Sequence, residues 1–433
     1  MPRKKTIKLS DSKNPKGLGK SKIFSNKEES QPSLNLGIIG HVDHGKTTLL
    51  ERLSGKWADT HSEEMKRGIT IRLGYADVTF RKCAKCKLFT ARSKCPECKE
   101  KTEEIRKVSF VDAPGHESLM ATMLAGATIM DGALLLIAAN EECPQPQTRE
   151  HIMALEIMGV KDLVVVQNKI DIIDEEGAIK NYEQIKKFLS KTSYKNSPII
   201  PISAQHDTGL SPLIEVIEKT IKTPIRDTKK DALMLVARSF DVNKPGTEIE
   251  KIGGGVLGGA LRQGILKKGE EIEIKPGYEV KEKNKSVWKV LKTKIIGVKS
   301  GGASLKEVVP GGSIGILTSL DPSIVSSDKL TGSIAGIPGK TPPVWDEITL
   351  EIHLLDRVVG SKEDLNVQPI KLNESLMLNV NSAATVGVVY ELGKNKVKCR
   401  LKLPVCAELD SRVTISRMIG NRFRLIGYGI IKE

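Results

Sequence analysis

One short segment combines the residue types that bind phosphate. Residues 40–47 read GHVDHGKT, which fits the pattern G-x-x-x-x-G-K-S/T. Glycines let successive backbone N–H groups point at phosphate oxygens, Lys46 can reach the outer phosphates, and the Thr47 hydroxyl is placed to ligate Mg²⁺. The segment therefore predicts binding of a nucleoside triphosphate. The contacts expected from this stretch are Asp43, His44, Gly45, Lys46, Thr47 and Thr48.

Two later segments indicate which base is bound. Asn168-Lys169-Ile170-Asp171 follows an apolar run, and the Asp171 carboxylate can accept both the N1–H and the amino group of guanine, a pairing that adenine cannot offer. Ser203-Ala204-Gln205 follows the next apolar run, where backbone N–H groups can bond guanine O6. Each short motif alone could be an ordinary polar turn, but their order along the chain predicts GTP. The guanine contacts expected are Asn168, Lys169, Asp171, Ser203, Ala204 and Gln205.

The segments between these motifs predict a switch and a catalytic group. Asp112 ends an apolar run and can hold Mg²⁺, usually through water, while the Gly115 N–H can meet the γ-phosphate. His116 is the candidate for orienting the attacking water. Thr70 would close onto Mg²⁺ and the γ-phosphate only with GTP bound, although its segment could also be a plain strand entry. Because the sequence shows no arginine finger, hydrolysis is expected to wait for another macromolecule.

Four cysteines predict a metal site. Cys83 and Cys86 form one C-x-x-C pair, and Cys95 and Cys98 form a second pair eight residues later. This spacing favours a tetrahedral Cys₄ zinc knuckle over residues 81–101, with disulfides as the alternative, unfavourable in a reducing compartment. The insert is rich in Lys and has little else to form a core, so zinc should hold it together. Its place in the sequence suggests a docking element near the switch.

The elements that must position these residues change in character along the chain. Residues 34–224 alternate β-like and helix-like runs, which predicts an α/β domain with a mostly parallel sheet and ligands at the carboxyl ends of its strands. Strands are expected at 36–40, 73–80, 108–112, 133–139, 163–168 and 199–203. Helices are expected at 48–53, 119–130, 148–158, 181–191 and 213–222. Short β-rich runs between Gly and Pro turns then predict two small barrels, at 225–341 and 342–433.

Bulk composition limits the class of protein. The chain has 433 residues, too many for one core. No run approaches a membrane span and the N-terminus does not look like a signal peptide, so we expect a cytoplasmic protein with no membrane partner. A net charge of +15 points to a polyanion such as RNA or DNA, or to a merely basic surface. Residues 1–33 are predicted to be a disordered basic tail, with or without a role in RNA contact.

The motifs together resemble a known family. Five segments of the chain resemble the translational GTPases related to elongation factor Tu. They are Gly40–Leu49, Arg67–Ala76, Phe110–Gly126, Asp131–Ile152 and Val166–Asp171. Other stretches resemble more closely the gamma subunits of archaeal and eukaryotic translation initiation factor 2, over all but the basic tail. They are Lys66–Ala76, the cysteine insert, Leu119–Leu124, Ala139–Thr148, Arg238–Gly246 and Arg424–Gly429.

The resemblance implies a function and partners. It implies a GTP-dependent carrier that delivers methionyl initiator tRNA to the small ribosomal subunit with mRNA, and that leaves after GTP hydrolysis to GDP. It also implies a heterotrimer, with the alpha subunit on the second domain and the beta subunit on the GTPase domain. In this family Asp43 and the Gly68 backbone can join Thr47, Thr70 and Asp112 around magnesium.

Three other readings stay open at this level. The nearest is an elongation-type aminoacyl-tRNA carrier, including the selenocysteine factor, although the Cys₄ insert and the Arg238–Gly246 stretch argue against it. A second is a binding module that uses GTP only as a structural ligand. The third is a zinc-dependent nucleic-acid enzyme. The sequence argues against it, because it shows no open metal site with a general base.

Overall fold

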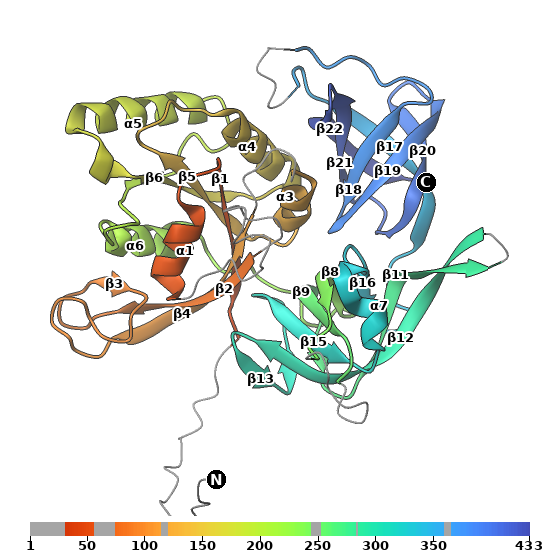
Figure 1. Cartoon of the computed structure of the whole chain (residues 1–433), viewed down its shortest axis with the longest axis horizontal. Coiled ribbons are helices and arrows are strands. Elements are labelled where there is room, and N and C mark those ends of the chain that lie inside the picture. Colours follow the sequence, from red (N-terminus) through yellow and green to blue (C-terminus); the bar gives the residue numbers. More distant parts are fainter. Residues whose placement is uncertain (1–30, 56–73, 114–119, 244–252, 283–284, 359–364) are drawn as a thin grey trace, which may run out of the picture.

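The computed structural model describes residues 31–55, 74–113, 120–243, 253–282, 285–358 and 365–433. They form an α/β domain followed by two antiparallel β-barrels, as the sequence predicted (Figure 1). Of the predicted tail, residues 1–30 lie outside the described part. Described contacts begin at Gln31, whose side chain bonds the backbone of Val309 and Gly311 in the second domain.

A seven-stranded sheet forms the centre of the first domain, in the order β3-β2-β4-β1-β5-β6-β7. Neighbouring strands from β4 to β7 run parallel, so their carboxyl ends meet at one edge, whereas β2 pairs antiparallel with both β4 and β3. The strands are β1 (Leu34–Gly40), β2 (Gly74–Lys82), β3 (Phe89–Thr90), β4 (Glu103–Asp112), β5 (Gly132–Ala138), β6 (Asp162–Asn168) and β7 (Ile199–Pro201).

Helices cover both faces of this sheet because the sheet is apolar on both sides. Leu49 and Leu50 of α1 share one buried cluster with Leu213 and Ile217 of α6. Apolar side chains of α3, α4 and α5 form the cluster on the other face. The helices are α1 (Lys46–Ser54), α3 (Met120–Ala127), α4 (Pro146–Met158), α5 (Glu175–Leu189) and α6 (Leu210–Thr220), with a short 3₁₀ turn η2 (Ile170–Ile172) after β6.

The second domain is a six-stranded barrel in the order β11-β16-β8-β9-β15-β12, closed by pairing of β12 with β11. Its core is formed by Met234, Leu257, Ile274, Ile316 and their neighbours. The elements are β8 (Leu233–Phe240), β9 (Val256–Gln263), β10 (Leu266–Lys267), β11 (Glu271–Glu282), β12 (Lys285–Ser300), β13 (Ala303–Leu305), β14 (Glu307–Val308), β15 (Ile314–Thr318), α7 (Pro322–Val325), η4 (Ser326–Asp328) and β16 (Ile334–Gly336).

The third domain is a closed barrel in the order β17-β20-β19-β18-β21-β22. Buried and exposed residues alternate along much of β19 and β20, as expected for strands with one face in the barrel core. The strands are β17 (Val344–Leu354), β18 (Ser375–Val380), β19 (Ala383–Leu392), β20 (Lys396–Cys406), β21 (Arg412–Ile419) and β22 (Arg422–Lys432).

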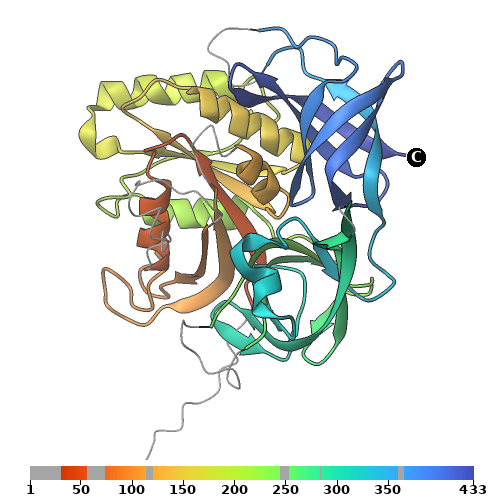
Figure 2. The same cartoon turned by 45° about the vertical axis from the view of Figure 1, so that its right-hand side comes forward.

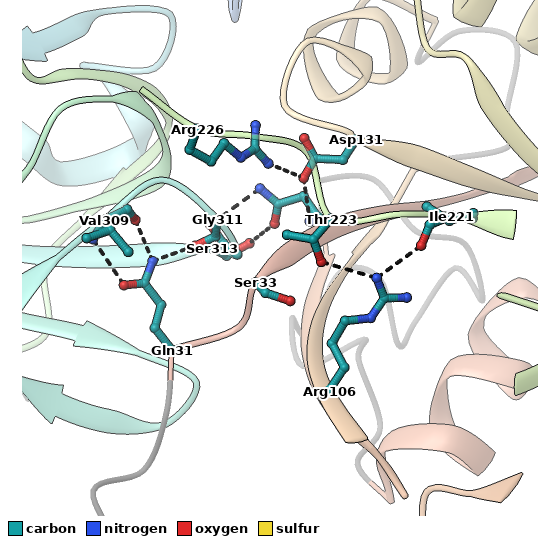
Figure 3. Close-up of polar contacts among 12 residues, drawn as sticks. Gln31, Ser33, Arg106, Asp131, Ile221, Thr223, Arg226, Val309, Gly311 and Ser313 are labelled. Atoms are coloured by element: carbon teal, nitrogen blue, oxygen red, sulfur yellow. Dashed lines mark hydrogen bonds and ion pairs between the residues drawn. The ribbon is translucent and has the colours of Figure 1, made fainter. Parts of the chain in front are cut away.

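Both barrels contact the GTPase domain. Arg226, in the linker after α6, pairs with Asp131 at 2.5 Å (Figure 3). The third domain lies against α3 and α4 (Figures 1 and 2), where Arg424 of β22 pairs with Glu150 at 2.7 Å. Within the described residues, no helix is long and apolar enough to cross a membrane.

Candidate functional site

The segment between β1 and α1 has the shape of a phosphate-binding loop. Gly45 has φ +87°, a left-handed conformation, and α1 begins at the next residue. A Cβ on Gly45 would lie 2.3 Å from Asn168 Nδ2, so only glycine fits where the loop passes the guanine motif. The loop therefore presents the N-terminal end of α1, with its backbone N–H groups and positive dipole end, to an anion.

Lys46 and Thr47 lie where the sequence predicts them. The Lys46 ammonium is buried and donates to the carbonyl oxygens of Gly40 at 3.0 Å and His41 at 2.7 Å. The Thr47 hydroxyl donates to Asp112 Oδ2 at 3.3 Å. Parallel pairing of β1 with β4 produces this meeting, because it places Asp112 at the same edge as the loop. A hydroxyl and a buried carboxylate are the hard oxygen ligands that suit Mg²⁺.

Asn168 joins the phosphate loop to the guanine motifs. Its Nδ2 donates to His44 O at 3.0 Å, and its Oδ1 accepts from Ala204 N at 3.0 Å. The Ser203 hydroxyl bonds the carboxylate of Asp171 and so lowers the pKa of Asp171. The Asp171 carboxylate can therefore accept two hydrogen bonds from guanine.

The other predicted nucleotide contacts lie around the same edge. Asp43 is exposed with φ +62°, and Lys169 is also left-handed, with φ +64°. Thr48 is half-buried in the first turn of α1, and Gln205 is exposed after β7. His44 is buried, and its ring contacts Leu136 O at 2.9 Å and Glu141 Oε2 at 3.2 Å. Burial lowers the pKa of His44, and the two acceptors act in the opposite direction.

Four predicted site residues lie outside the described part of the chain. They are Gly68, Thr70, Gly115 and His116. The predicted switch, the γ-phosphate contact and the candidate for orienting water therefore remain predictions from sequence.

Two helices support the loop through residues that the motifs did not indicate. His151 of α4 is fully buried, and its Nδ1 accepts from Gly40 N at 3.1 Å. Burial, with Lys46 nearby, lowers the pKa of His151 to about 3. Asn181 of α5 donates to Glu141 O at 2.7 Å. The sequence carried no clear signal for His151, because α4 also buries Gln147, Thr148 and Glu150.

The four cysteines of the insert come together. The sulfur atoms of Cys83, Cys86, Cys95 and Cys98 all lie within 4.8 Å of one another, and none is in a disulfide. Sulfur atoms about 3.8 Å apart are expected around tetrahedral zinc with Zn–S bonds of about 2.3 Å, and Cys83 Sγ lies 3.5 Å from Cys98 Sγ. Backbone N–H groups of Cys98 and Glu97 lower the pKa of Cys95 to about 7, whereas hydrogen bonding to Cys98 raises the pKa of Cys86. The support for a metal is thus the geometry of the four sulfur atoms. The cluster therefore suits a structural zinc.

The insert contacts the GTPase domain beside the guanine motif. Arg92 Nη2 lies 2.6 Å from Asp207 Oδ2, and Asp207 belongs to the loop that follows Ser203–Gln205. The backbone N–H of Phe89, in β3, donates to Ser211 Oγ of α6 at 3.0 Å. Among the described residues, the insert thus contacts α6 and the loop that follows Ser203–Gln205. Residues 56–73, which include the predicted switch, lie outside the described part, so docking of the insert near the switch stays a prediction.

The fold and the site together define a translational GTPase, a GTP-binding α/β domain followed by two β-barrels. Residues 31–223 match the family model of the elongation factor Tu GTP binding domain, and residues 346–431 match that of the C-terminal domain of initiation factor eIF2 gamma. The chain belongs to the family of translation initiation factor 2 gamma subunits.

Curated relatives match almost end to end. The subunit gamma of translation initiation factor 2 from Methanocaldococcus jannaschii is 55% identical over 94% of this chain and 99% of its own length. The one from Methanothermobacter thermautotrophicus is 56% identical over 93% of this chain and all of its own. This agreement confirms the resemblance inferred from the motifs and favours an initiation factor over an elongation-type carrier.

Solved structures of elongation factors share the fold. A bacterial selenocysteine-specific elongation factor superposes with a TM-score of 0.70 at 23% identity, covering 92% of this chain and 58% of its own. Elongation factor SelB from Methanococcus maripaludis, solved with a GTP analogue, superposes with a TM-score of 0.68 at 24% identity, over 93% of this chain and 79% of its own. At these identities the likeness concerns the fold alone.

Proposed function

We propose that this chain is the subunit that binds GTP and methionyl initiator tRNA and delivers that tRNA to the small ribosomal subunit. The observation that carries the proposal is the almost full-length match to translation initiation factor 2 gamma subunits. The assembled edge of phosphate loop, Asp112, Asn168 and Asp171 supports GTP as the ligand. The protein is proposed to carry out this function in the cytoplasm.

Thr47 and Asp112 would hold magnesium, together with Asp43, Thr70 and the Gly68 backbone. When bound, Mg²⁺ neutralises charge that builds up between the β- and γ-phosphates during hydrolysis. Lys46 would leave its carbonyl partners for the outer phosphates, and Gly115 would donate its N–H to the γ-phosphate. Thr70 would close only on GTP, and His116 would orient the attacking water.

The factor is proposed to work as a heterotrimer with an alpha subunit on the second domain and a beta subunit on the GTPase domain. A groove of about 1110 Å³ between α4, α5 and the loop after β17 offers the beta subunit a surface on that domain. Its lining combines apolar and charged side chains, which include Arg149, Ile152, Met153, Glu156, Lys187 and Phe188.

This docking has a matched test. Met153→Glu places a charge in the groove and should abolish capture of the beta subunit, whereas Ile179→Glu, on an exposed part of α5 outside the groove, should leave capture intact. Equal capture by both variants would place the beta subunit elsewhere.

The tRNA proposal is tested by equilibrium binding with the alpha subunit present. Methionyl initiator tRNA and elongator methionyl-tRNA are compared with a non-hydrolysable GTP analogue and with GDP. We expect tight binding only for initiator tRNA with the GTP analogue. Equal binding of both tRNAs would indicate an elongation-type carrier, and binding indifferent to nucleotide would leave GTP as a structural ligand.

A further inference from the structure

The insert carries a basic surface that the GTP site does not use. Residues 82–101 contain seven Lys or Arg against two Glu, a net charge of +5. We define the knuckle surface as four exposed lysines that form no ion pair within the described residues. These lysines are Lys87, Lys94, Lys99 and Lys101.

Two of these lysines occupy matching strained positions. The two turns of the insert have the same hydrogen bonds, from Cys83 N to Leu88 O at 2.9 Å and from Cys95 N to Glu100 O at 2.8 Å. In each turn the residue after the second cysteine is left-handed, Lys87 with φ +59° and Lys99 with φ +62°. Glycine adopts this conformation without cost and lysine does not, so a charged side chain is present twice where folding alone would favour glycine.

Neutralising the metal site accounts for only part of this charge. Four thiolates around Zn²⁺ leave a surplus of negative charge that nearby cations offset. Other basic residues of the insert already have partners, since Lys85 pairs with Glu100 at 3.2 Å and Arg92 pairs with Asp207. Lys82 lies over the Phe89 ring at 4.7 Å. Lys99 donates to the uncharged carbonyl of Pro96 at 2.6 Å. All four lysines of the knuckle surface therefore keep a positive charge that no carboxylate of the described residues pairs with.

The insert projects beyond the edge strand β3, on the side of the GTPase domain away from the third domain (Figure 1). We propose that the knuckle surface docks on the phosphate backbone of small-subunit ribosomal RNA, which rests on the proposed function. A cluster of lysines fits closely spaced phosphates, and the net charge of the whole chain, +15, has the same sign. The alpha subunit is proposed to lie on the second domain and the beta subunit in the groove between α4 and α5. Neither proposed contact covers this edge of the GTPase domain, which leaves it free for the small ribosomal subunit.

The test uses the full chain with a GTP analogue and purified small ribosomal subunits. Lys87→Gly/Lys99→Gly removes two charges and also relieves two left-handed residues, and Lys87→Gln/Lys99→Gln removes the charges only. Both should weaken subunit binding about tenfold and lower the slope of log affinity against log salt by about two, because each phosphate contact contributes about one to that slope. The glycine variant should melt no lower than the natural chain, so a purely structural role and a binding role predict different results.

The matched control is Lys340→Gln/Lys394→Gln, two exposed lysines of the barrel region. It should bind subunits normally, and all variants should keep their zinc content and their initiator tRNA affinity. Unchanged subunit binding by the knuckle variants, or an equal loss in the control, overturns the proposal.

A second comparison uses deproteinised ribosomal RNA. If the variants lose affinity for intact subunits but not for this RNA, the knuckle surface binds an acidic ribosomal protein instead, and the proposal is overturned. The separate tRNA assay distinguishes either failure from failure of the carrier function.

Discussion

At the scale of single residues, Asp171 is predicted to decide which base the site accepts. The Ser203 hydroxyl lowers the pKa of its carboxylate, and the side chain is 26% exposed, so that a base can reach it. Asp171→Asn keeps the shape but places an amide N–H₂ where guanine also donates. We expect GDP and GTP affinity to fall by about 10²–10³-fold, as when a hydrogen-bonded charged partner is lost. Fluorescent GDP binding measures this, and unchanged affinity would show that Asp171 does not contact the base.

His151 should make the stability of the GTPase domain depend on pH. Its pKa is lowered to about 3 by burial, against about 6.5 in the unfolded chain. Below pH 6.5 His151 is protonated in the unfolded state but stays neutral in the folded state. The free energy of unfolding therefore falls by about 1.4 kcal/mol for each pH unit down to about pH 3. Above pH 6.5 both states are neutral and the effect vanishes.

The measurement compares thermal midpoints of the natural chain and His151→Asn at falling pH. The substitution itself costs stability because Gly40 N–H loses its ring acceptor. As the pH falls from 7 to 5, the gap between the two midpoints should narrow. A gap independent of pH would mean that His151 is not a buried neutral ring.

At the scale of elements, the zinc knuckle should fold only with its metal. The described insert has few buried apolar residues beyond its cysteines, so chelation should open it. Hydrogen exchange of residues 83–101 should rise sharply on zinc removal. GDP affinity should change less than about fivefold, because exposed pairs such as Arg92–Asp207 contribute at most about 1 kcal/mol. Loss of all nucleotide binding would show that the knuckle holds the guanine loop in place.

The start of α5 shows how element limits could and could not be predicted. Apolar spacing predicts this helix at 181–191, whereas α5 begins at Glu175 because Asp174 caps it by accepting from Gly177 N at 2.8 Å. The cap was visible as an acidic residue before the helix, but apolar periodicity is weak in its first turns. The strand β3 could not be predicted, since its two residues pair only after the insert folds back on β2.

Some residues of the candidate site could likewise be predicted from the sequence and others could not. Lys46, Thr47 and Asp171 follow from motif spacing, because local backbone conformation and strand order alone bring them to one edge. Asp207 and Glu141 could not be predicted, since their partners come from the insert and the phosphate loop, distant in sequence. Such contacts depend on tertiary packing, which no local pattern records.

At the scale of the whole molecule, an interface of directed polar contacts sets the second domain against the GTPase domain (Figure 3). Asp131 accepts from Arg226 and, at 2.9 Å, from Asn35 N, and only 9% of its side chain is exposed. Nearby, Asn35 donates to Gly312 O, and Lys107 donates to Gly301 O at 2.7 Å. The Asp131 carboxylate thus joins β1 to the linker, and the side chains of Asn35 and Lys107 join the GTPase domain to the second barrel.

Removing Arg226 should loosen this arrangement. Arg226→Ala leaves the Asp131 carboxylate largely buried with one partner fewer, so we expect a loss of about 3 kcal/mol in the free energy of unfolding. Lys219→Ala is the control, because the exposed Lys219–Glu215 pair on α6 should contribute no more than about 0.5 kcal/mol. Small-angle scattering should also show a wider distribution of domain separations for Arg226→Ala alone. Identical stability and scattering for the two variants would mean that apolar packing, rather than the Arg226–Asp131 pair, fixes the angle between the domains.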